Sequence, residues 1–292
     1  MKSAFLLFAC SLMLLSPLTA AEVQIQKDIE YAHVGEHSLR LDLHRPAKDG
    51  PYPLIVWVHG GAWRAGSKDS MPLADLLSKG YAIASVDYRL SPVAPFPAQV
   101  HDIKAAIRYL RANSKTYNLR TEKIAIAGSS AGGHLAALVG VTNGDNKLEG
   151  TVGDHLDQSS EVAAIIDLYG PTNFLTILKQ STPHGLGVRI PALQLLLRKQ
   201  PEDDPILAKL ASPVSHVDRE DPPLLLIHGV QDPQVPISQS LELHGVYQQK
   251  GRPVHLHMIY DGVHGGPPFY DSQRIDLMDR FLTPILIEDT DS

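Results

Sequence analysis

The sequence predicts an α/β fold with a doubly wound, mostly parallel sheet, antiparallel strands at its N-terminal edge and a small cap insertion. Short, continuously apolar runs recur along the chain, as is typical of strands that are covered on both faces. Helix-like segments with one apolar stripe lie between these runs, and this alternation indicates a parallel sheet. Of the 292 residues 43% are hydrophobic, which is enough for the core of one large domain.

The first residues have the order of a secretory signal peptide. Lys2 is the only charge in residues 1–21, a leucine-rich stretch runs from Ala4 to Leu18, and small residues follow up to Ala21. A membrane anchor is the alternative, but the apolar stretch is shorter than the about 20 residues that a spanning helix needs. We therefore expect cleavage near Ala20 or Ala21, export to the periplasm or the medium, and no membrane span in the mature protein.

The single cysteine and the negative net charge limit which disulfides and which partners the protein can have. Cys10 is the only cysteine and lies inside the apolar stretch, so the mature chain relies on its core without disulfides. Leu7–Cys10 loosely resembles a lipoprotein cleavage box, and lipidation of Cys10 is the lesser alternative. The formal net charge of −6 argues against nucleic acid as a partner.

Two strands are expected first, over 23–31 and 38–44. In the second, Leu39, Leu41 and Leu43 alternate with polar residues, which gives one buried and one exposed face. A tight turn at Gly35 joins the two strands. The pattern predicts an antiparallel pair at the edge of the sheet.

The elements after residue 50 alternate between strands and helices. Apolar runs predict strands at 54–58, 82–86, 124–127, 162–168, 224–227 and 254–259, and the helix candidates are 102–111, 134–139, 238–250 and 272–282. One stretch, 171–216, interrupts the rhythm, and its leucines predict an amphipathic helix between the helix breakers Pro191 and Pro201. Insertions at strand ends of such sheets line ligand crevices, so we expect a cap or lid here. The alternative is a helix that only covers the edge of the sheet.

Residues 128–132 read Gly-Ser-Ser-Ala-Gly, a G-x-S-x-G motif with Ser130 at its centre. An apolar run precedes the motif and a helix-like run follows it, which is the strand, turn and helix of a nucleophile elbow. Side chains at the two flanking positions would collide with neighbouring backbone, and both positions are glycine. The pattern predicts a serine hydrolase.

A nucleophilic serine needs a histidine to take its proton and a carboxylate to orient that histidine, in the order serine, acid, histidine on this fold. Asp232 follows the expected strand 224–227, and His264 follows the last strand. Loops at the carboxyl ends of parallel strands open on the same side of the sheet, so both should lie near Ser130. The alternatives are that Asp232 only caps the next helix, or that Asp261 is the acid, although Asp261 is too close to His264 in the loop to reach it well.

The oxyanion hole is expected from two turns. Ala131 supplies the backbone N–H that follows the nucleophile, at the start of a helix. The turn His59-Gly60-Gly61-Ala62-Trp63 follows an early strand, and Gly61 and Ala62 are the expected donors because small residues let backbone N–H groups approach the oxygen. His59 is expected to brace this turn. Trp63 is either a substrate-facing aromatic or a packed one.

Together these motifs resemble the α/β-hydrolase superfamily, and more narrowly the hormone-sensitive-lipase-like esterases and the bifunctional feruloyl/acetylxylan esterases. The resemblance is carried by HGGAW (59–63), VDYRLSP with APFPAQVHD (86–102), GSSAGG (128–133), HGVQDPQVP (228–236) and DGVHGG (261–266). It implies the triad Ser130, Asp232 and His264, with Asp87, Tyr88 and Arg89 as supports of the active-site floor. Ala62 replaces the third glycine of the usual HGGG, which a backbone donor tolerates.

The resemblance also implies a single catalytic domain over 22–292, with 171–216 setting specificity. Only the strand-like segment 23–44 precedes the core, so the long N-terminal cap of many lipase-like esterases is not expected. The expected function is a serine carboxylic-ester hydrolase for short-chain acyl or for acetyl and feruloyl carbohydrate esters, with no metal and no cofactor. Other hypotheses are a prolyl-oligopeptidase-like peptidase, an arylformamidase-like amide hydrolase and a non-catalytic binding scaffold. Oligomeric state is open.

Overall fold

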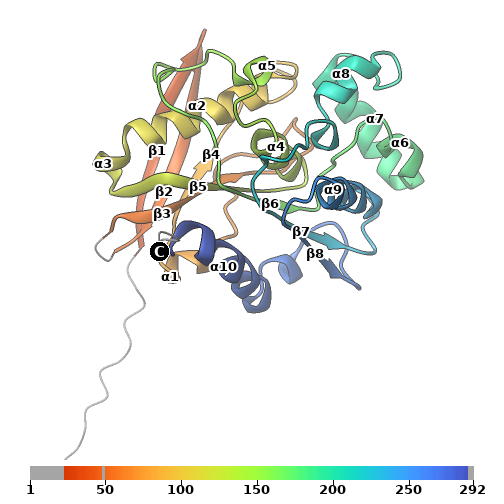
Figure 1. Ribbon diagram of the computed structural model, residues 1–292. Coiled ribbons are helices and arrows are strands. Elements are labelled where there is room, and N and C mark those ends of the chain that lie inside the picture. The colour runs from red at the N-terminus through yellow and green to blue at the C-terminus, as the bar shows by residue number, and fades with distance from the viewer. Residues whose placement is uncertain (1–22, 48–49, 289–292) are drawn as a thin grey trace, which may run out of the picture.

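The computed structural model describes residues 23–47 and 50–288 (Figure 1). The expected signal peptide with Cys10 lies outside the described residues. All described strands join one eight-stranded sheet in the order β1-β2-β4-β3-β5-β6-β7-β8. The strands are β1 (Val23–Val34), β2 (His37–Pro46), β3 (Tyr52–Val58), β4 (Ala82–Val86), β5 (Leu119–Ser129), β6 (Ala164–Leu168), β7 (Leu224–Gly229) and β8 (Val254–Ile259).

Pairing directions confirm the predicted mixed sheet. β1 and β2 form an antiparallel pair at one edge, and β2 pairs antiparallel with β4. From β4 to β8 every pairing is parallel. Val58 at the end of β3 pairs with Gly128 of β5, and Leu168 at the end of β6 pairs with Ile227 of β7. The loops after these strands therefore leave the sheet along one edge, where they can meet.

Helices cover both faces of the sheet (Figure 1). The main helices are α2 (Ala98–Ala112), α4 (Ala131–Gly140), α7 (Pro183–Leu197), α9 (Ser238–Gln249) and α10 (Ser272–Leu286), and the short ones are α1 (Asp75–Ser78), α3 (Ser114–Tyr117), α5 (Asn146–Glu149), α6 (Ile177–Gln180), α8 (Pro205–Leu210), η1 (Pro213–Ser215) and η2 (Pro267–Phe269). Buried side chains of α2, α4 and α9 pack on one face, and those of α1 and α10 pack on the other. Within the described ranges, no helix combines the length and the apolar character that crossing a membrane requires.

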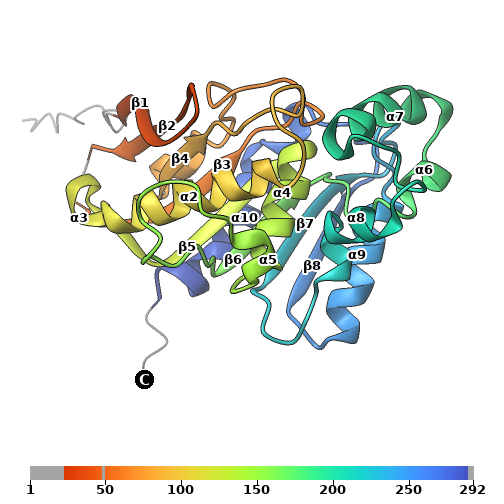
Figure 2. The ribbon, with the colours of Figure 1, turned by 90° about the horizontal axis from the view of Figure 1, so that it is seen from above.

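The segment 171–216 holds α6, α7, α8 and η1. Its helices α6, α7 and α8 gather at the end of the molecule away from β1 and β2 (Figure 2). The prediction that its helix starts after Pro191 was wrong, because α7 begins at Pro183 and Pro191 lies inside it. A proline inside a helix removes one hydrogen bond without ending the helix when packing compensates. Here Ala192, Leu193 and Leu196 are all fully buried beyond the proline.

Candidate active site

Ser130 lies at the tight turn between β5 and α4. Its backbone has φ 54° and ψ −120°, a conformation that residues other than glycine rarely adopt. A Cβ on Gly132 would lie 2.1 Å from the carbonyl oxygen of Val58, and a Cβ on Gly128 would lie 2.2 Å from the carbonyl oxygen of Gly132. The two flanking glycines therefore let the turn pack against β3 and against its own backbone, as the sequence pattern predicts.

The structure brings Ser130, His264 and Asp232 together, from the loops after β5, β8 and β7. His264 Nε2 lies 2.9 Å from Ser130 Oγ, and His264 Nδ1 lies 2.7 Å from Asp232 Oδ2. The side chain of Asp232 is fully buried, whereas that of His264 is 13% exposed. Asp261, the rival acid, is exposed on the surface. This arrangement can accept a proton from the serine hydroxyl and stabilise the imidazolium that forms.

Asp232 is held from several directions. Its Oδ1 accepts hydrogen bonds from the backbone N–H of Gln234 at 2.8 Å and of Val235 at 2.9 Å. His228 Nε2 lies 3.5 Å from Oδ2. Burial favours the neutral acid, but the contacts with His228 and His264 outweigh burial and hold the pKa of Asp232 well below its ordinary value. The carboxylate therefore stays charged throughout the neutral range.

His228 is a site residue that the sequence analysis did not single out. It lies on β7, where Nε2 donates to the carbonyl oxygen of Val235 at 2.9 Å and Nδ1 accepts from Ser240 Oγ at 2.7 Å. These bonds fix the ring beside Asp232 and tie the acid loop to α9. The sequence did contain a signal for this role, because His228 lies near the end of β7, only four residues before Asp232 in the loop that follows.

The turn 59–63 packs directly against the nucleophile. A Cβ on Gly60 would lie 3.4 Å from the Cβ of Ser130. Ala62 and Trp63 have φ of 52° and 59°, in the left-handed region, and Gly61 has φ of 113°. Two successive non-glycine residues in this region indicate a turn whose backbone direction is imposed by its surroundings. The turn also lies against the N-terminus of α4, because a Cβ on Gly132 would lie 2.6 Å from the carbonyl oxygen of His59.

Trp63 lies inside the protein. Its side chain has no exposed surface, and its Nε1 donates a hydrogen bond to His134 on α4. The indole also packs edge-on against Phe174 of the segment 171–216, with ring centroids 5.5 Å apart. The indole therefore joins the turn, α4 and the segment 171–216.

The surroundings of His59 match the expected bracing role. Its ring stacks on Tyr88 with centroids 4.5 Å apart, and its carbonyl oxygen accepts a hydrogen bond from the Tyr88 hydroxyl. Burial lowers the pKa of His59. Arg89 pairs with the buried Asp102 at 2.7 Å and holds the adjacent loop to α2. These contacts join the turn 59–63, the loop after β4 and α2.

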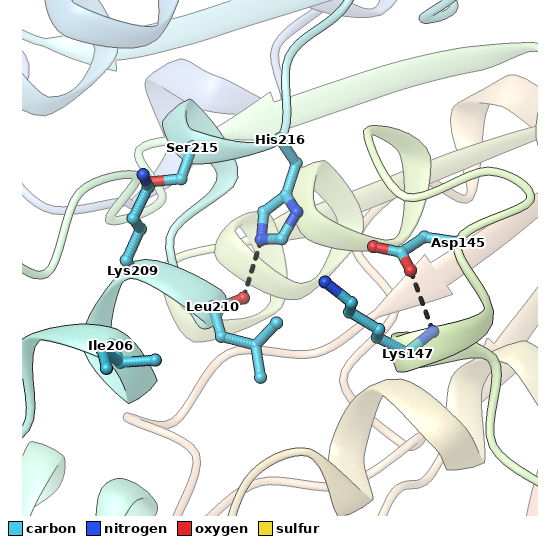
Figure 3. A pocket seen from close by; sticks show the side chains of 7 residues that line it. All are labelled: Asp145, Lys147, Ile206, Lys209, Leu210, Ser215 and His216. Atoms are coloured by element: carbon cyan, nitrogen blue, oxygen red, sulfur yellow. Dashed lines mark hydrogen bonds between the residues drawn. The ribbon is translucent and has the colours of Figure 1, made fainter.

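A separate hollow of about 420 Å³ lies between α5, α8 and η1 (Figure 3). Its lining includes Asp145, Ile206 and His216, and His216 is held by a hydrogen bond to the carbonyl oxygen of Leu210. None of its lining residues belongs to the triad or to the turn 59–63. The hollow is therefore distinct from the candidate active site.

Comparison with known proteins decides the family. The sequence profile of the BD-FAE family matches residues 41–247. The chain belongs to the BD-FAE family. This match covers the turn 59–63, the elbow and Asp232, and it ends before His264.

Individual relatives and solved structures are also similar to this chain. Esterase LipC of Mycobacterium tuberculosis is 33% identical over 193 residues, which are 65% of this chain and 47% of that protein. A truncated carbohydrate esterase from gut microbiota is 34% identical with a TM-score of 0.79, covering 91% of this chain and 97% of the other. An acetyl ester-xyloside bifunctional hydrolase from Caldicellulosiruptor lactoaceticus is 26% identical with a TM-score of 0.70, covering 86% and 89%. The chain spans about half the length of the curated relatives it matches, at 47%, 49% and 50%.

Proposed function

We propose that this BD-FAE family protein is a serine carboxylic-ester hydrolase that works through an acyl-enzyme. The observation that carries the proposal is the continuous hydrogen-bonded chain from Ser130 through His264 to Asp232. Each member comes from a different loop at one edge of the sheet, and the strained backbone of Ser130 presents its hydroxyl to the imidazole. Relatives named as esterases support this assignment.

The reaction starts when Ser130 Oγ attacks the ester carbonyl and His264 Nε2 takes the hydroxyl proton. The carbonyl oxygen becomes an oxyanion, and the backbone N–H groups of Gly61, Ala62 and Ala131 are its proposed donors. The imidazolium then gives its proton to the alcohol oxygen as the carbon–oxygen bond breaks, and the alcohol leaves. Water then attacks the acyl carbon while His264 takes a proton from it. The bond between the acyl carbon and Ser130 Oγ breaks, the imidazolium returns the proton to Ser130 Oγ, and the carboxylic acid leaves.

Asp232 contributes charge and orientation. Its carboxylate contacts Nδ1 of His264, which leaves Nε2 free of a proton and directed at Ser130. Because its pKa lies well below the ordinary value, the carboxylate stays ionised when His264 becomes positive. The buried position of Asp232 strengthens this attraction relative to water.

The favoured substrates are short-chain acyl esters, with acetyl or feruloyl esters of carbohydrates first. A solved carbohydrate esterase and a solved acetyl ester-xyloside hydrolase are similar to this chain over most of their length, which supports that class. We take the segment 171–216 as the cap that shapes the substrate site, because its Phe174 packs against Trp63 beside the oxyanion turn. In this proposal Trp63 supports the substrate site from the protein interior, through its contact with Phe174.

Residues 1–21 are proposed as a cleaved signal peptide for export. Cell fractionation and N-terminal sequencing of the mature protein test this. Recovery outside the cytoplasm with a new N-terminus near residue 21 or 22 supports export. An intact N-terminus in the cytoplasm, or a lipid on Cys10, contradicts the cleavage that we propose.

A substrate panel tests the reaction itself. It contains p-nitrophenyl esters of rising chain length, acetylated xylan, methyl ferulate and a p-nitroanilide peptide, each assayed with the wild type and with Ser130→Ala. We expect ester turnover that falls by at least about 10³-fold in Ser130→Ala. Faster turnover of the peptide indicates a peptidase, and no turnover with the wild type favours a binding scaffold.

A further inference from the structure

Arg189 is a buried arginine beside the candidate active site. It lies on α7, its side chain is 1% exposed, and its guanidinium carbon lies 5.6 Å from the centroid of the Trp63 ring. Its Nη2 reaches the carbonyl oxygen of Gln234 at 3.5 Å, the outer limit of a hydrogen bond. Among the described residues, Nε and Nη1 have no hydrogen-bond partner.

The other buried cations of the described residues are paired with carboxylates. Lys68 pairs with Asp42, and Lys104 and Arg108 both pair with Glu149. Arg189 forms no ion pair with any residue that the structure describes. An unpaired buried charge is costly, and a group of this kind calls for a structural or functional explanation.

The guanidinium contacts the two loops that flank Ser130. Trp63 directly follows the proposed oxyanion donors, and Gln234 follows Asp232, to which its own N–H is bonded. Burial lowers the pKa of Arg189 to about 10, with the charge of Asp232 opposing this shift, so the side chain is positive at neutral pH. Asp232 is already satisfied by His264 and the backbone of its own loop. The cation therefore has charge and donors left for another acceptor.

We propose that Arg189 is a specificity residue that binds a carboxylate on the ester substrate, on either its acyl or its alcohol part. This inference rests on the proposed ester hydrolysis. A carboxylate supplies both the counter-charge and the oxygen acceptors that the buried guanidinium lacks, whereas a neutral sugar hydroxyl supplies only an acceptor. The long contact with Gln234 is the only hydrogen bond that holds the guanidinium among the described residues, and Nε and Nη1 are the donors that such a group would use.

Two matched pairs of substrates test this proposal. Mono-p-nitrophenyl succinate and p-nitrophenyl butyrate differ by a carboxylate on the acyl part, and 4-acetoxybenzoate and 4-acetoxybenzamide differ by a carboxylate on the alcohol part. We expect the wild type to prefer the carboxylate ester in one pair, by kcat/KM. Arg189→Met should lower kcat/KM for that ester at least tenfold and change the neutral ester less than threefold, with partial recovery in Arg189→Lys.

The remaining outcomes overturn the proposal. An equal loss for both members of each pair assigns Arg189 a structural or general electrostatic role. No preference for a carboxylate in either pair contradicts the proposal without any variant. Thermal unfolding shows whether Arg189→Met is folded. If it is not, the kcat/KM values of Arg189→Lys and of the wild type for the two substrate pairs still test the proposal. Hydrolysis of p-nitrophenyl butyrate that is lost in Ser130→Ala separates a failure of this inference from a failure of the proposed function.

Discussion

The indole Nε1 of Trp63 donates a hydrogen bond of 3.1 Å to Nδ1 of His134. His134 follows the elbow on α4, and its Nε2 donates to the carbonyl oxygen of Ala211 in the segment 171–216 at 2.7 Å. One buried imidazole thus joins the turn 59–63, α4 and the segment 171–216. The bond from Trp63 requires an unprotonated Nδ1, so the ring is neutral and carries its proton on Nε2.

His134 should make the fold sensitive to acid. Burial lowers its pKa from 6.5 to about 4 in the folded protein, so the unfolded chain takes up a proton first as pH falls. Stability from this group is present above pH 6.5 and is lost down to about pH 4. The loss amounts to about 3 kcal/mol. The variant His134→Gln keeps a donor and an acceptor but does not titrate. Its free energy of unfolding, measured with urea, should fall less between pH 6.5 and about pH 4 than that of the wild type. An unchanged drop in the variant would count against the role of His134.

Asp167 should have the opposite pH dependence. It is fully buried on β6, its Oδ1 accepts from the backbone N–H of Gly170, and its Oδ2 has no partner among the described residues. Burial raises its pKa from 3.8 to about 7, so the unfolded chain loses the proton first as pH rises. Stability is therefore lost between pH 3.8 and about 7, by about 4 kcal/mol.

The variant Asp167→Asn tests this directly, because an amide resembles the protonated acid and does not titrate. We expect its free energy of unfolding to exceed that of the wild type at pH 8 and to approach it at pH 4. A difference between the two proteins that stays constant with pH would show that Asp167 does not titrate as inferred. Ester turnover of both proteins serves as the check that the site is intact.

The elbow glycines should not tolerate a methyl group. A Cβ on Gly132 meets the Val58 carbonyl oxygen at 2.1 Å, and that oxygen is a backbone atom of β3, which is paired with a strand on each side and cannot shift at low cost. We expect Gly132→Ala to lower stability by about 3 kcal/mol or more and to remove activity. Gly245→Ala is the matched control, since no atom lies within 4 Å of that Cβ and the residue is inside α9. Gly245→Ala should raise the free energy of unfolding by up to about 1 kcal/mol. Equal changes in stability and activity in Gly132→Ala and Gly245→Ala would contradict the packing described.

His228 should act as a positioning residue for the acid. His228→Phe removes its contact with Asp232 Oδ2 and its bond to the Val235 carbonyl oxygen. We expect kcat to fall about tenfold or more with KM little changed, because charge-assisted contacts of this kind are worth about 1.5–3 kcal/mol. A rise in KM alone, with kcat preserved, would place His228 in substrate binding instead.

Local patterns in the sequence were enough to predict the sheet and the loops that carry Ser130, Asp232 and His264. Each of these residues follows an apolar strand, and parallel strands align their carboxyl ends. Contacts between distant segments left no such pattern. Arg189 lies in α7, whose start was misplaced in the prediction because Pro191 was taken as a helix breaker. Nothing in the sequence around Arg189 indicates an unpaired buried charge. The meeting of His134 with Trp63 joins residues 71 positions apart, which only the fold reveals.

The central claim is that Ser130 is the nucleophile, and labelling with a fluorophosphonate followed by intact-mass and peptide mass spectrometry tests it most directly. Ser129→Ala is the matched control, because Ser129 is the neighbouring serine at the end of β5. We predict a single adduct on Ser130 in the wild type and in Ser129→Ala, and none in Ser130→Ala. An adduct that persists in Ser130→Ala, or a folded wild type that takes up no label, would contradict the account.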